Sequence, residues 1–222
     1  MEKLITKIED IKVNLCEDDI LNFLQIQKRW PIQYSTSQPT VQIINELGNF
    51  YNDFFENTVD GIFLNYDKWL SLYNLGFTSI ISNVLDLSKE LRTLEKLIIE
   101  EIGVKVCGNF YFSKPGRKES FDKHTHSYDV IVKQIYGKSK WILNNQEIDL
   151  YPNQVLYVPK NTEHAVIEKT EKKLSLTFSP ILSFLPMQFI IKKSLIIYLL
   201  ITSLCFQNNL YSNTSLDDVE DF

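Results

Sequence analysis

The sequence predicts an α+β protein in which a helical N-terminal region packs on a small antiparallel barrel or double-sheet roll. Over about the first hundred residues, apolar side chains such as Ile20, Phe23 and Leu24 recur at helical spacing. From Val104 onward the chain instead forms short runs rich in β-branched and aromatic residues, with turn residues between them. No low-complexity linker separates the two parts, so we expect one continuous fold.

The N-terminal region contains two marked helices. The first follows the acidic pair Asp18-Asp19 and is expected to end at Trp30-Pro31, because proline cannot continue a helix. For the second, Asp86 or Ser88 is a candidate N-cap and Gly103 a candidate stop. Its apolar side chains share one stripe that is expected to pack on a sheet: Leu91, Leu94, Leu97, Ile98 and Ile102.

The strand-like runs that follow are VKVCGNFYF, YDVIVKQIY, SKWIL, EIDL, QVLYVP, HAVIEK and KLSLTFS. Turn-prone residues separate several of them: Pro115-Gly116, Gly137, Asn144-Asn145 and Pro152-Asn153. We therefore divide the chain into a helical region at 1–103, a barrel core at 104–180 and a C-terminal segment at 181–222.

Composition narrows the class of protein. With 222 residues, of which 44% are apolar, the chain can bury one substantial core. A net charge of -5 argues against a general nucleic-acid binder, because that affinity depends on cationic contacts. Cys16, Cys107 and Cys205 show no CxxC spacing, and the start MEKLITKIED has no apolar signal core. A cytoplasmic, reducing location is therefore expected.

The most apolar run, LIIYLLITSLCF at residues 195–206, follows two lysines near the end of the chain. It is uncharged for only 12 residues, which is short for a membrane span, so no span is predicted. We expect it to be buried in the core or in a homodimer interface.

The three histidines of the chain predict a metal site. His124 and His126 are two residues apart in HTHSYDVIVKQIYG, so on one strand both rings point to the same face. His164, in NQVLYVPKNTEH, follows about forty positions later and can complete a facial set. Neutral imidazole is the commonest protein ligand for iron, zinc, copper and nickel.

Both stretches resemble the general cupin pattern. In the first, two histidines separated by one residue precede the turn residue Gly137, but Val130 stands where that pattern has a glutamate. Asp129 is one residue earlier and on a regular strand faces the other way, which makes it a poor ligand. In the second stretch, Asn153 and Asn161 replace expected glycines. Asparagine tolerates positive φ, so the tight turns can survive.

A wider block resembles the JmjC-like cupins of the ribosomal-oxygenase type, which hydroxylate protein side chains with iron(II) and 2-oxoglutarate. It contains GFTSII, a long helix, GNFYFSKPG, FDKHTHSYDVIVKQIYGKSKW, LYPNQVLYVPKNTEHAV and LSLTF in the family's order. The resemblance covers roughly Trp30 to Phe178 and is strong only from Gly76 onward.

This resemblance implies a double-stranded β-helix that holds Fe(II) at the positions of His124, His126 and His164. The carboxylate that the family has at the second position is here His126. At the position of Ser139 the family has a lysine or arginine that binds 2-oxoglutarate, and serine lacks that charge. The flanking Lys138 and Lys140 are expected on the outer face, so use of 2-oxoglutarate is in question.

Several polar residues are candidates for binding a cosubstrate or substrate. Asn109, Tyr111 and Ser113 alternate on the strand that enters the site, and Thr177 lies near the end of the roll. Ser139 joins them through the resemblance. A solvated sheet face would explain the alternation equally well. The basic cluster Lys114, Arg117, Lys118 and Lys123 forms either a solvated loop or a substrate-binding lid.

The function expected from these features is a non-haem iron-dependent oxygenase that hydroxylates a protein, peptide or small-molecule substrate. Three-histidine cupins also support dioxygen chemistry without 2-oxoglutarate, so an enzyme independent of that cosubstrate is one alternative. A cupin that binds metal or ligand without catalysis is the other.

Overall fold

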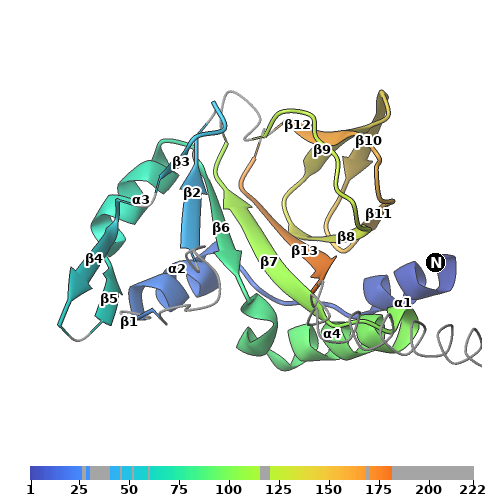
Figure 1. Cartoon of the computed structure of the whole chain (residues 1–222), viewed down its shortest axis with the longest axis horizontal. Coiled ribbons are helices and arrows are strands. Elements are labelled where there is room, and N and C mark those ends of the chain that lie inside the picture. Colours follow the sequence, from blue (N-terminus) through green and yellow to red (C-terminus); the bar gives the residue numbers. More distant parts are fainter. Residues whose placement is uncertain are drawn as a thin grey trace, which may run out of the picture. The chain divides into compact units, whose positions relative to one another are not determined.

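The computed structural model describes residues 1–26, 29–30, 41–45, 47–51, 53–59, 61–115, 121–168 and 171–181 (Figure 1). The helices are α1 (Glu2–Asp10), α2 (Glu17–Ile26), α3 (Tyr66–Asn74) and α4 (Lys89–Ile102), with a 3-10 turn η1 at Val84–Leu87. The strands before α4 are β1 (Arg29–Trp30), β2 (Val41–Ile44), β3 (Phe50–Tyr51), β4 (Phe55–Thr58), β5 (Gly61–Leu64) and β6 (Thr78–Ser82). The strands after it are β7 (Val106–Ser113), β8 (Val130–Tyr136), β9 (Ser139–Leu143), β10 (Gln146–Leu150), β11 (Val155–Val158), β12 (His164–Glu168) and β13 (Lys173–Pro180).

Two antiparallel sheets make the roll. The larger sheet has the order β11-β8-β13-β7-β6-β2-β3, and the smaller has the order β10-β9-β12. Figure 1 shows the smaller sheet beside β8 and β13, while α1 and α4 lie below the large sheet. This arrangement confirms the predicted α+β class with a double-stranded β-helix.

The N-terminal region is more mixed than the sequence pattern predicted. Its helices lie within residues 1–103, but β2, β3 and β6 from the same region extend the large sheet, and β6 pairs with β7 across the expected boundary. The strands VQII and TSIIS are short and almost fully buried, and neither shows a regular alternation of apolar and polar residues. Periodicity cannot separate such runs from a buried helix, which is why these strands were missed.

The long helix α4 is built as its sequence predicts. Ser88 is the N-cap, and its side chain accepts a hydrogen bond from the Leu91 N–H at 3.2 Å. Gly103 ends the helix in the left-handed conformation at φ 75°. Leu91, Leu94 and Ile98 are fully buried in the main core.

The tight turns also match their predicted chemistry. Asn153 and Asn161 adopt positive φ values of 68° and 61°. Gly137 has φ 69°, and a Cβ built there would lie 2.0 Å from the backbone oxygen of Lys172. Glycine is therefore required at 137 for space as well as for conformation.

A buried lysine connects the N-terminal helix to the roll through hydrogen bonds. Lys133 on β8 is fully buried, and its Nζ donates to the backbone oxygens of Ile8 at 3.0 Å and Asn153 at 3.3 Å. Burial lowers the pKa of its ammonium group. The Ile8 oxygen belongs to the last turn of α1 and also accepts from the Ile11 N–H at 3.3 Å, so Lys133 gives this carbonyl a second donor.

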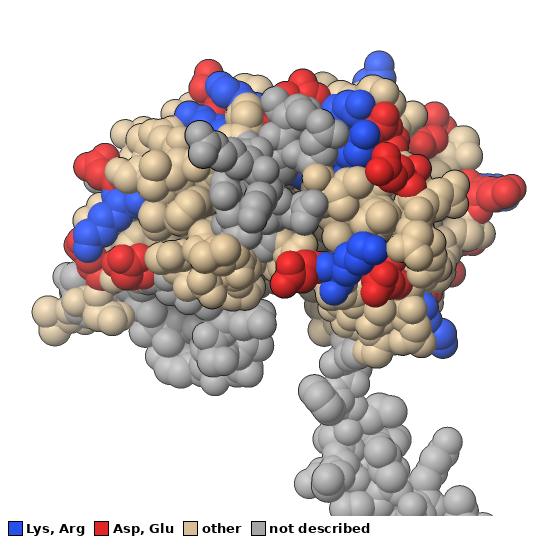
Figure 2. Space-filling view, turned by 90° about the horizontal axis from the view of Figure 1, so that it is seen from above, with Lys and Arg blue, Asp and Glu red and all other residues tan. Residues whose placement is uncertain are grey.

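Residues 182–222 lie outside the described part of the chain, as do the apolar run at 195–206 and the homodimer interface expected there. Within the described residues, no helix is both long enough and apolar enough to cross a membrane. On the face seen in Figure 2, basic and acidic side chains are interspersed.

Candidate metal centre

The polypeptide backbone brings the two histidine stretches together. The His124 N–H donates to the His164 oxygen at 3.1 Å, and the His164 N–H donates back to the His124 oxygen at 2.9 Å, which makes an isolated antiparallel bridge. The oxygen of His126 accepts from the Asn161 N–H at 2.7 Å. The turn at Asn161 therefore fixes the position of His126 relative to the start of β12.

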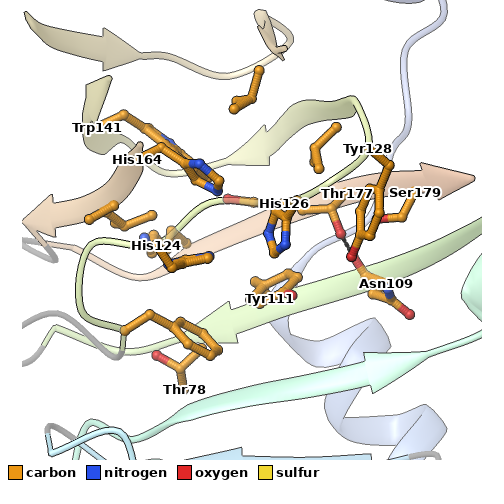
Figure 3. A pocket seen from close by; sticks show the side chains of 17 residues that line it. Thr78, Asn109, Tyr111, His124, His126, Tyr128, Trp141, His164, Thr177 and Ser179 are labelled. Carbon is orange, nitrogen blue, oxygen red and sulfur yellow. Dashed lines mark hydrogen bonds between the residues drawn. The ribbon is translucent and has the colours of Figure 1, made fainter. Parts of the chain in front are cut away.

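The three histidine rings converge on one point (Figure 3). One ring nitrogen from each of His124, His126 and His164 lies within 4.8 Å of the others, close enough for all three to hold a single metal ion. The ring centroids are 4.5 to 5.1 Å apart. The structure thus brings together all three residues that the sequence proposed as metal ligands.

Two of the rings have a defined free nitrogen. Nδ1 of His124 is 2.8 Å from the Asp122 oxygen, and Nδ1 of His164 is 2.8 Å from the Thr162 oxygen. A backbone carbonyl can only accept, so Nδ1 carries the proton. In the neutral ring Nε2 then keeps the lone pair that a metal needs.

The electrostatic environment favours neutral rings. Burial is the main cause that lowers the pKa of both His126 and His164, and the neighbouring imidazoles lower them further. A hydrogen bond to the Thr162 backbone opposes part of this effect at His164. Neutral imidazole is the form that binds metal, so the fold prepares these rings for that role.

The histidines line a cavity of about 290 Å³. Each histidine ring lies beside an aromatic side chain. His126 stacks on Tyr128, with ring centroids 5.0 Å apart. The centroid distances are 5.8 Å from Phe121 to His124 and 6.3 Å from Trp141 to His164. Val130, at the position where the cupin pattern has a glutamate, also lines this cavity. The wall is therefore largely apolar beside the rings.

Asp129 does not join the site. Its Oδ1 accepts a hydrogen bond from the Lys160 N–H at 2.8 Å, and it lines a different pocket near the end of α4. Strand alternation had predicted this orientation.

Three of the proposed substrate-binding residues line the cavity. Asn109 and Tyr111 come from β7, and Thr177 comes from β13 directly opposite Asn109. Burial raises the pKa of Tyr111 to about 12, so its hydroxyl stays protonated at neutral pH. Ser113 on the same face of β7 is fully buried, and its Oγ has no hydrogen-bond partner in the described part of the chain.

Ser139 does not line the cavity and is committed to a buried network. Its Oγ donates to Gln134 Oε1 at 2.9 Å and accepts from Trp141 Nε1 at 3.0 Å. Ser175 Oγ donates to the same Gln134 oxygen at 2.8 Å. The hydroxyl at 139 thus uses its donor and an acceptor within the protein instead of facing a ligand.

The lysines beside Ser139 point outward, as alternation predicted. Lys138 pairs with Asp149 at 3.1 Å, and Lys140 pairs with Glu147 at 3.6 Å. Neither lysine lines the histidine cavity.

The cavity also contains a lysine that the motif comparison overlooked. Lys173, the first residue of β13, is buried at 4% exposure and lines the cavity. Its signal was the alternation in KLSLTFS, where Lys173, Ser175 and Thr177 share one face while Leu174 and Leu176 share the other. The family pattern has its cation at the position of residue 139, on a different strand, and so does not single out Lys173.

The basic loop is only partly described. Lys114 donates to Asn74 Oδ1 at 2.6 Å, and Lys123 donates to Asn145 Oδ1 at 3.1 Å. Arg117 and Lys118 lie outside the described residues. The role of this loop as a lid stays a prediction.

Comparison with known proteins agrees with the fold. Residues 82–154 match the JmjC domain family. This match and the double-stranded β-helix together support a JmjC-like cupin fold for the described roll.

Among solved structures, the fold is similar to that of YcfD, a ribosomal oxygenase from Escherichia coli in complex with cobalt and succinic acid. The TM-score is 0.51 at 14% identity, over 94% of this chain and 53% of that one. The chain thus spans about half the length of YcfD.

Two further similarities are local. A cupin superfamily protein from Desulfitobacterium hafniense aligns over 34% of this chain and 67% of its own at 24% identity and a TM-score of 0.31. The HTH-type transcriptional activator RhaS from Mannheimia succiniciproducens is 40% identical over 48 residues, which are 22% of this chain and 18% of that protein.

Proposed function

We propose that the protein is a non-haem, Fe(II)-dependent oxygenase that hydroxylates a protein, peptide or small-molecule substrate. The observation that carries this proposal is the convergence of three imidazoles at the wall of a cavity in a JmjC-like cupin. His124, His126 and His164 would hold the metal. When bound, iron would supply the activation of dioxygen.

The donor set fits such a metal. Each ring presents a nitrogen to the same point, and two rings are oriented by backbone carbonyls that fix which nitrogen is free. Imidazole suits iron as well as zinc, copper and nickel, so the donors alone do not select among these metals. YcfD, which shares the fold, binds cobalt, and this accords with a divalent metal here.

The surrounding residues would bind and orient a substrate. The aromatic and aliphatic wall would give a ligand an apolar surface beside the rings, and Tyr111 presents a protonated hydroxyl that can donate to an oxygen of the ligand. Asn109 and Thr177 add polar groups on the same wall. This combination of apolar wall and few polar groups is typical of a small-ligand cavity.

The first experiment tests the metal. The protein is reconstituted anaerobically with Fe(II), and bound iron is measured in the native protein, in His164→Ala and in Asp129→Asn. We expect about one iron per chain in the native protein and in Asp129→Asn, because that carboxylate faces away from the cavity. His164→Ala should lose most of its iron. Absence of bound iron from the native protein would refute the proposal.

The second experiment tests turnover and the role of 2-oxoglutarate. Oxygen is admitted to the iron-loaded protein, and the consumption of oxygen and of 2-oxoglutarate is followed. Succinate formed by the native protein would support 2-oxoglutarate-dependent oxygenation. Oxygen consumption without succinate would favour an oxygenase that does not need this cosubstrate.

A repurposed site is the second candidate function, because His126 replaces a carboxylate and Ser139 is occupied by the Gln134 network. The double variant His126→Asp, Ser139→Lys restores the family's residue types at both positions. Succinate formed only by this variant would identify the native protein as a cupin that binds metal or ligand without the family's reaction.

A further inference from the structure

The imidazole of His126 is held differently from the other two. Nδ1 of His124 lies 2.8 Å from the Asp122 oxygen, and Nδ1 of His164 lies 2.8 Å from the Thr162 oxygen, so a hydrogen bond fixes each of these rings. Among the residues that the structure describes, none forms a hydrogen bond with a ring nitrogen of His126. A ring that is not held must give up rotational freedom when it binds a metal, which weakens binding.

The side chain of Tyr128 stacks on His126 (Figure 3). The ring centroids are 5.0 Å apart, and the two planes are within 9° of parallel. Phe121 and Trp141 lie farther from their histidines, at 5.8 and 6.3 Å, and are tilted by 47° and 26°. Offset parallel rings attract each other at such distances. The closest and most parallel of these three contacts thus belongs to the histidine whose ring no hydrogen bond orients.

The backbone on both sides of Tyr128 is anchored to the same turn. The His126 oxygen accepts from the Asn161 N–H at 2.7 Å, and Asp129 Oδ1 accepts from the Lys160 N–H at 2.8 Å. The strand β8 begins directly after Asp129. Tyr128 is therefore fixed in place relative to His126, as a residue that orients another side chain must be.

Tyr128 also lies at the boundary between two cavities. Besides the histidine cavity, it lines the pocket of about 240 Å³ near the end of α4, and among the described residues it is the one that both linings share. The second pocket is mainly apolar, with Ile102, Val106, Ile131 and Phe178 in its wall. Truncating Tyr128 would add space to cavities that already exist, which costs less than a new void in the core, so we expect such a variant to fold.

We propose that Tyr128 is a positioning residue of the metal centre, whose ring holds the His126 imidazole in its metal-binding orientation. It does for His126 what the Asp122 and Thr162 carbonyls do for the other two rings. The inference rests on the proposed function, because it takes His126 as a metal ligand. An imidazole has an aromatic face that can be oriented by stacking, whereas a carboxylate at this position has none. The departure from the family at residue 126 thus has a support of its own.

Two variants of Tyr128 separate its ring from its hydroxyl. Tyr128→Leu removes the aromatic face and keeps an apolar side chain, while Tyr128→Phe keeps the face and removes the hydroxyl. Tyr157→Leu is the matched control, because Tyr157 is also half-buried and lines the second pocket but not the histidine cavity. Each variant is first checked for folding by its thermal melting curve.

The affinity for Co(II), used as the probe metal, is measured by competition with a chelator. Loss of an outer partner of a metal ligand costs about 10- to 100-fold in affinity, so Tyr128→Leu should bind Co(II) at least about tenfold more weakly than the native protein. Tyr128→Phe and Tyr157→Leu should bind like the native protein. The visible absorption spectrum of Co(II)-loaded Tyr128→Leu should shift toward that of His126→Ala, because both changes disturb the same ligand.

A double-mutant cycle tests whether the ring acts through His126. Adding Tyr128→Leu to His126→Ala should weaken Co(II) binding much less than it does in the native protein. An equal loss in both backgrounds would assign the ring to the fold alone and overturn the inference. Native affinity in folded Tyr128→Leu would also overturn it, and so would a loss in Tyr128→Phe as large as that in Tyr128→Leu.

Nuclear magnetic resonance of the metal-free protein gives a readout that needs no metal. The chain has three histidines, so their ring-proton signals are assigned by replacing each in turn with alanine. Stacking on Tyr128 should shift the His126 ring protons upfield, and this shift should disappear in Tyr128→Leu and persist in Tyr128→Phe. Unchanged His126 signals in Tyr128→Leu would overturn the inference whether or not metal binds. Failure of the native protein to bind Co(II), with these signal changes present, would count against the proposed function and still support the contact.

Discussion

Replacing Ser139 by alanine should lower the stability of the fold without weakening ligand binding. The Ser139 hydroxyl is the acceptor for Trp141 Nε1 at 3.0 Å and the donor to Gln134 Oε1 at 2.9 Å. Its removal leaves the indole N–H without this partner, while Gln134 Oε1 keeps the bond from Ser175 at 2.8 Å. One buried donor is thus left unsatisfied.

An unsatisfied buried donor costs roughly 1–3 kcal/mol in the free energy of unfolding. For a domain of this size, about 1 kcal/mol corresponds to a fall of roughly 2–4 °C in melting temperature. Ser139→Ala should therefore melt several degrees lower than the native protein. Ser71→Ala, which removes an exposed hydroxyl on α3, is the control and should change the melting temperature little.

A double-mutant cycle makes this test sharper. Trp141→Phe removes the donor itself, so adding Ser139→Ala to that variant should cost less than it does in the native protein. Urea unfolding of the four proteins measures the coupling free energy. Unchanged stability of Ser139→Ala, combined with weaker binding of succinate, would refute the reasoning and assign the hydroxyl to a ligand.

Three further predictions follow from the same structure. Gly137→Ala should destabilise the fold far more than Gly103→Ala, as urea unfolding can measure, because a Cβ at 137 would lie 2.0 Å from a backbone oxygen whereas nothing lies within 4 Å at 103. The metal-free protein should lose stability as the pH falls below about 6.5, the ordinary histidine pKa, because the lowered pKa values of His126 and His164 let the unfolded state take up protons first. A free energy of unfolding that does not change between pH 5 and pH 8 would contradict this prediction. Removing the metal with a chelator should lower the melting temperature, since metal at about a hundred times its dissociation constant adds about 2.7 kcal/mol to the free energy of unfolding.

Local features of the fold could be read from the sequence because their causes are local. The cap at Ser88, the stop at Gly103 and the left-handed asparagine at 161 each depend on one residue and its immediate neighbours. The convergence of the three histidines was also predictable, since strand alternation places His124 and His126 together and the second motif places His164 nearby.

Features that depend on distant pairing could not be read in the same way. The partners of Gln134 come from β9 and β13, and Ser175 is 41 residues away in sequence. No residue near Ser139 in the sequence indicates that its hydroxyl is hydrogen-bonded within the protein. Likewise, Lys173 lines the histidine cavity because β13 pairs with both β7 and β8, and sequence alternation alone does not specify that pairing.

The two departures from the resembled family act at different places in the cavity and have different consequences. His126 in place of a carboxylate raises the charge at the metal position by one unit, while Ser139 removes a cation from the small sheet. The cavity wall on the large sheet is instead formed by residues of β7 and β13, among them Asn109, Tyr111 and Thr177. Tyr111 and Thr177 line the same cavity as the three histidines, so a ligand bound on the β7 and β13 side would contact them. Tyr111→Phe should therefore weaken the binding of succinate to the metal-loaded protein, as calorimetric titration can measure, whereas unchanged affinity would place the ligand elsewhere in the cavity.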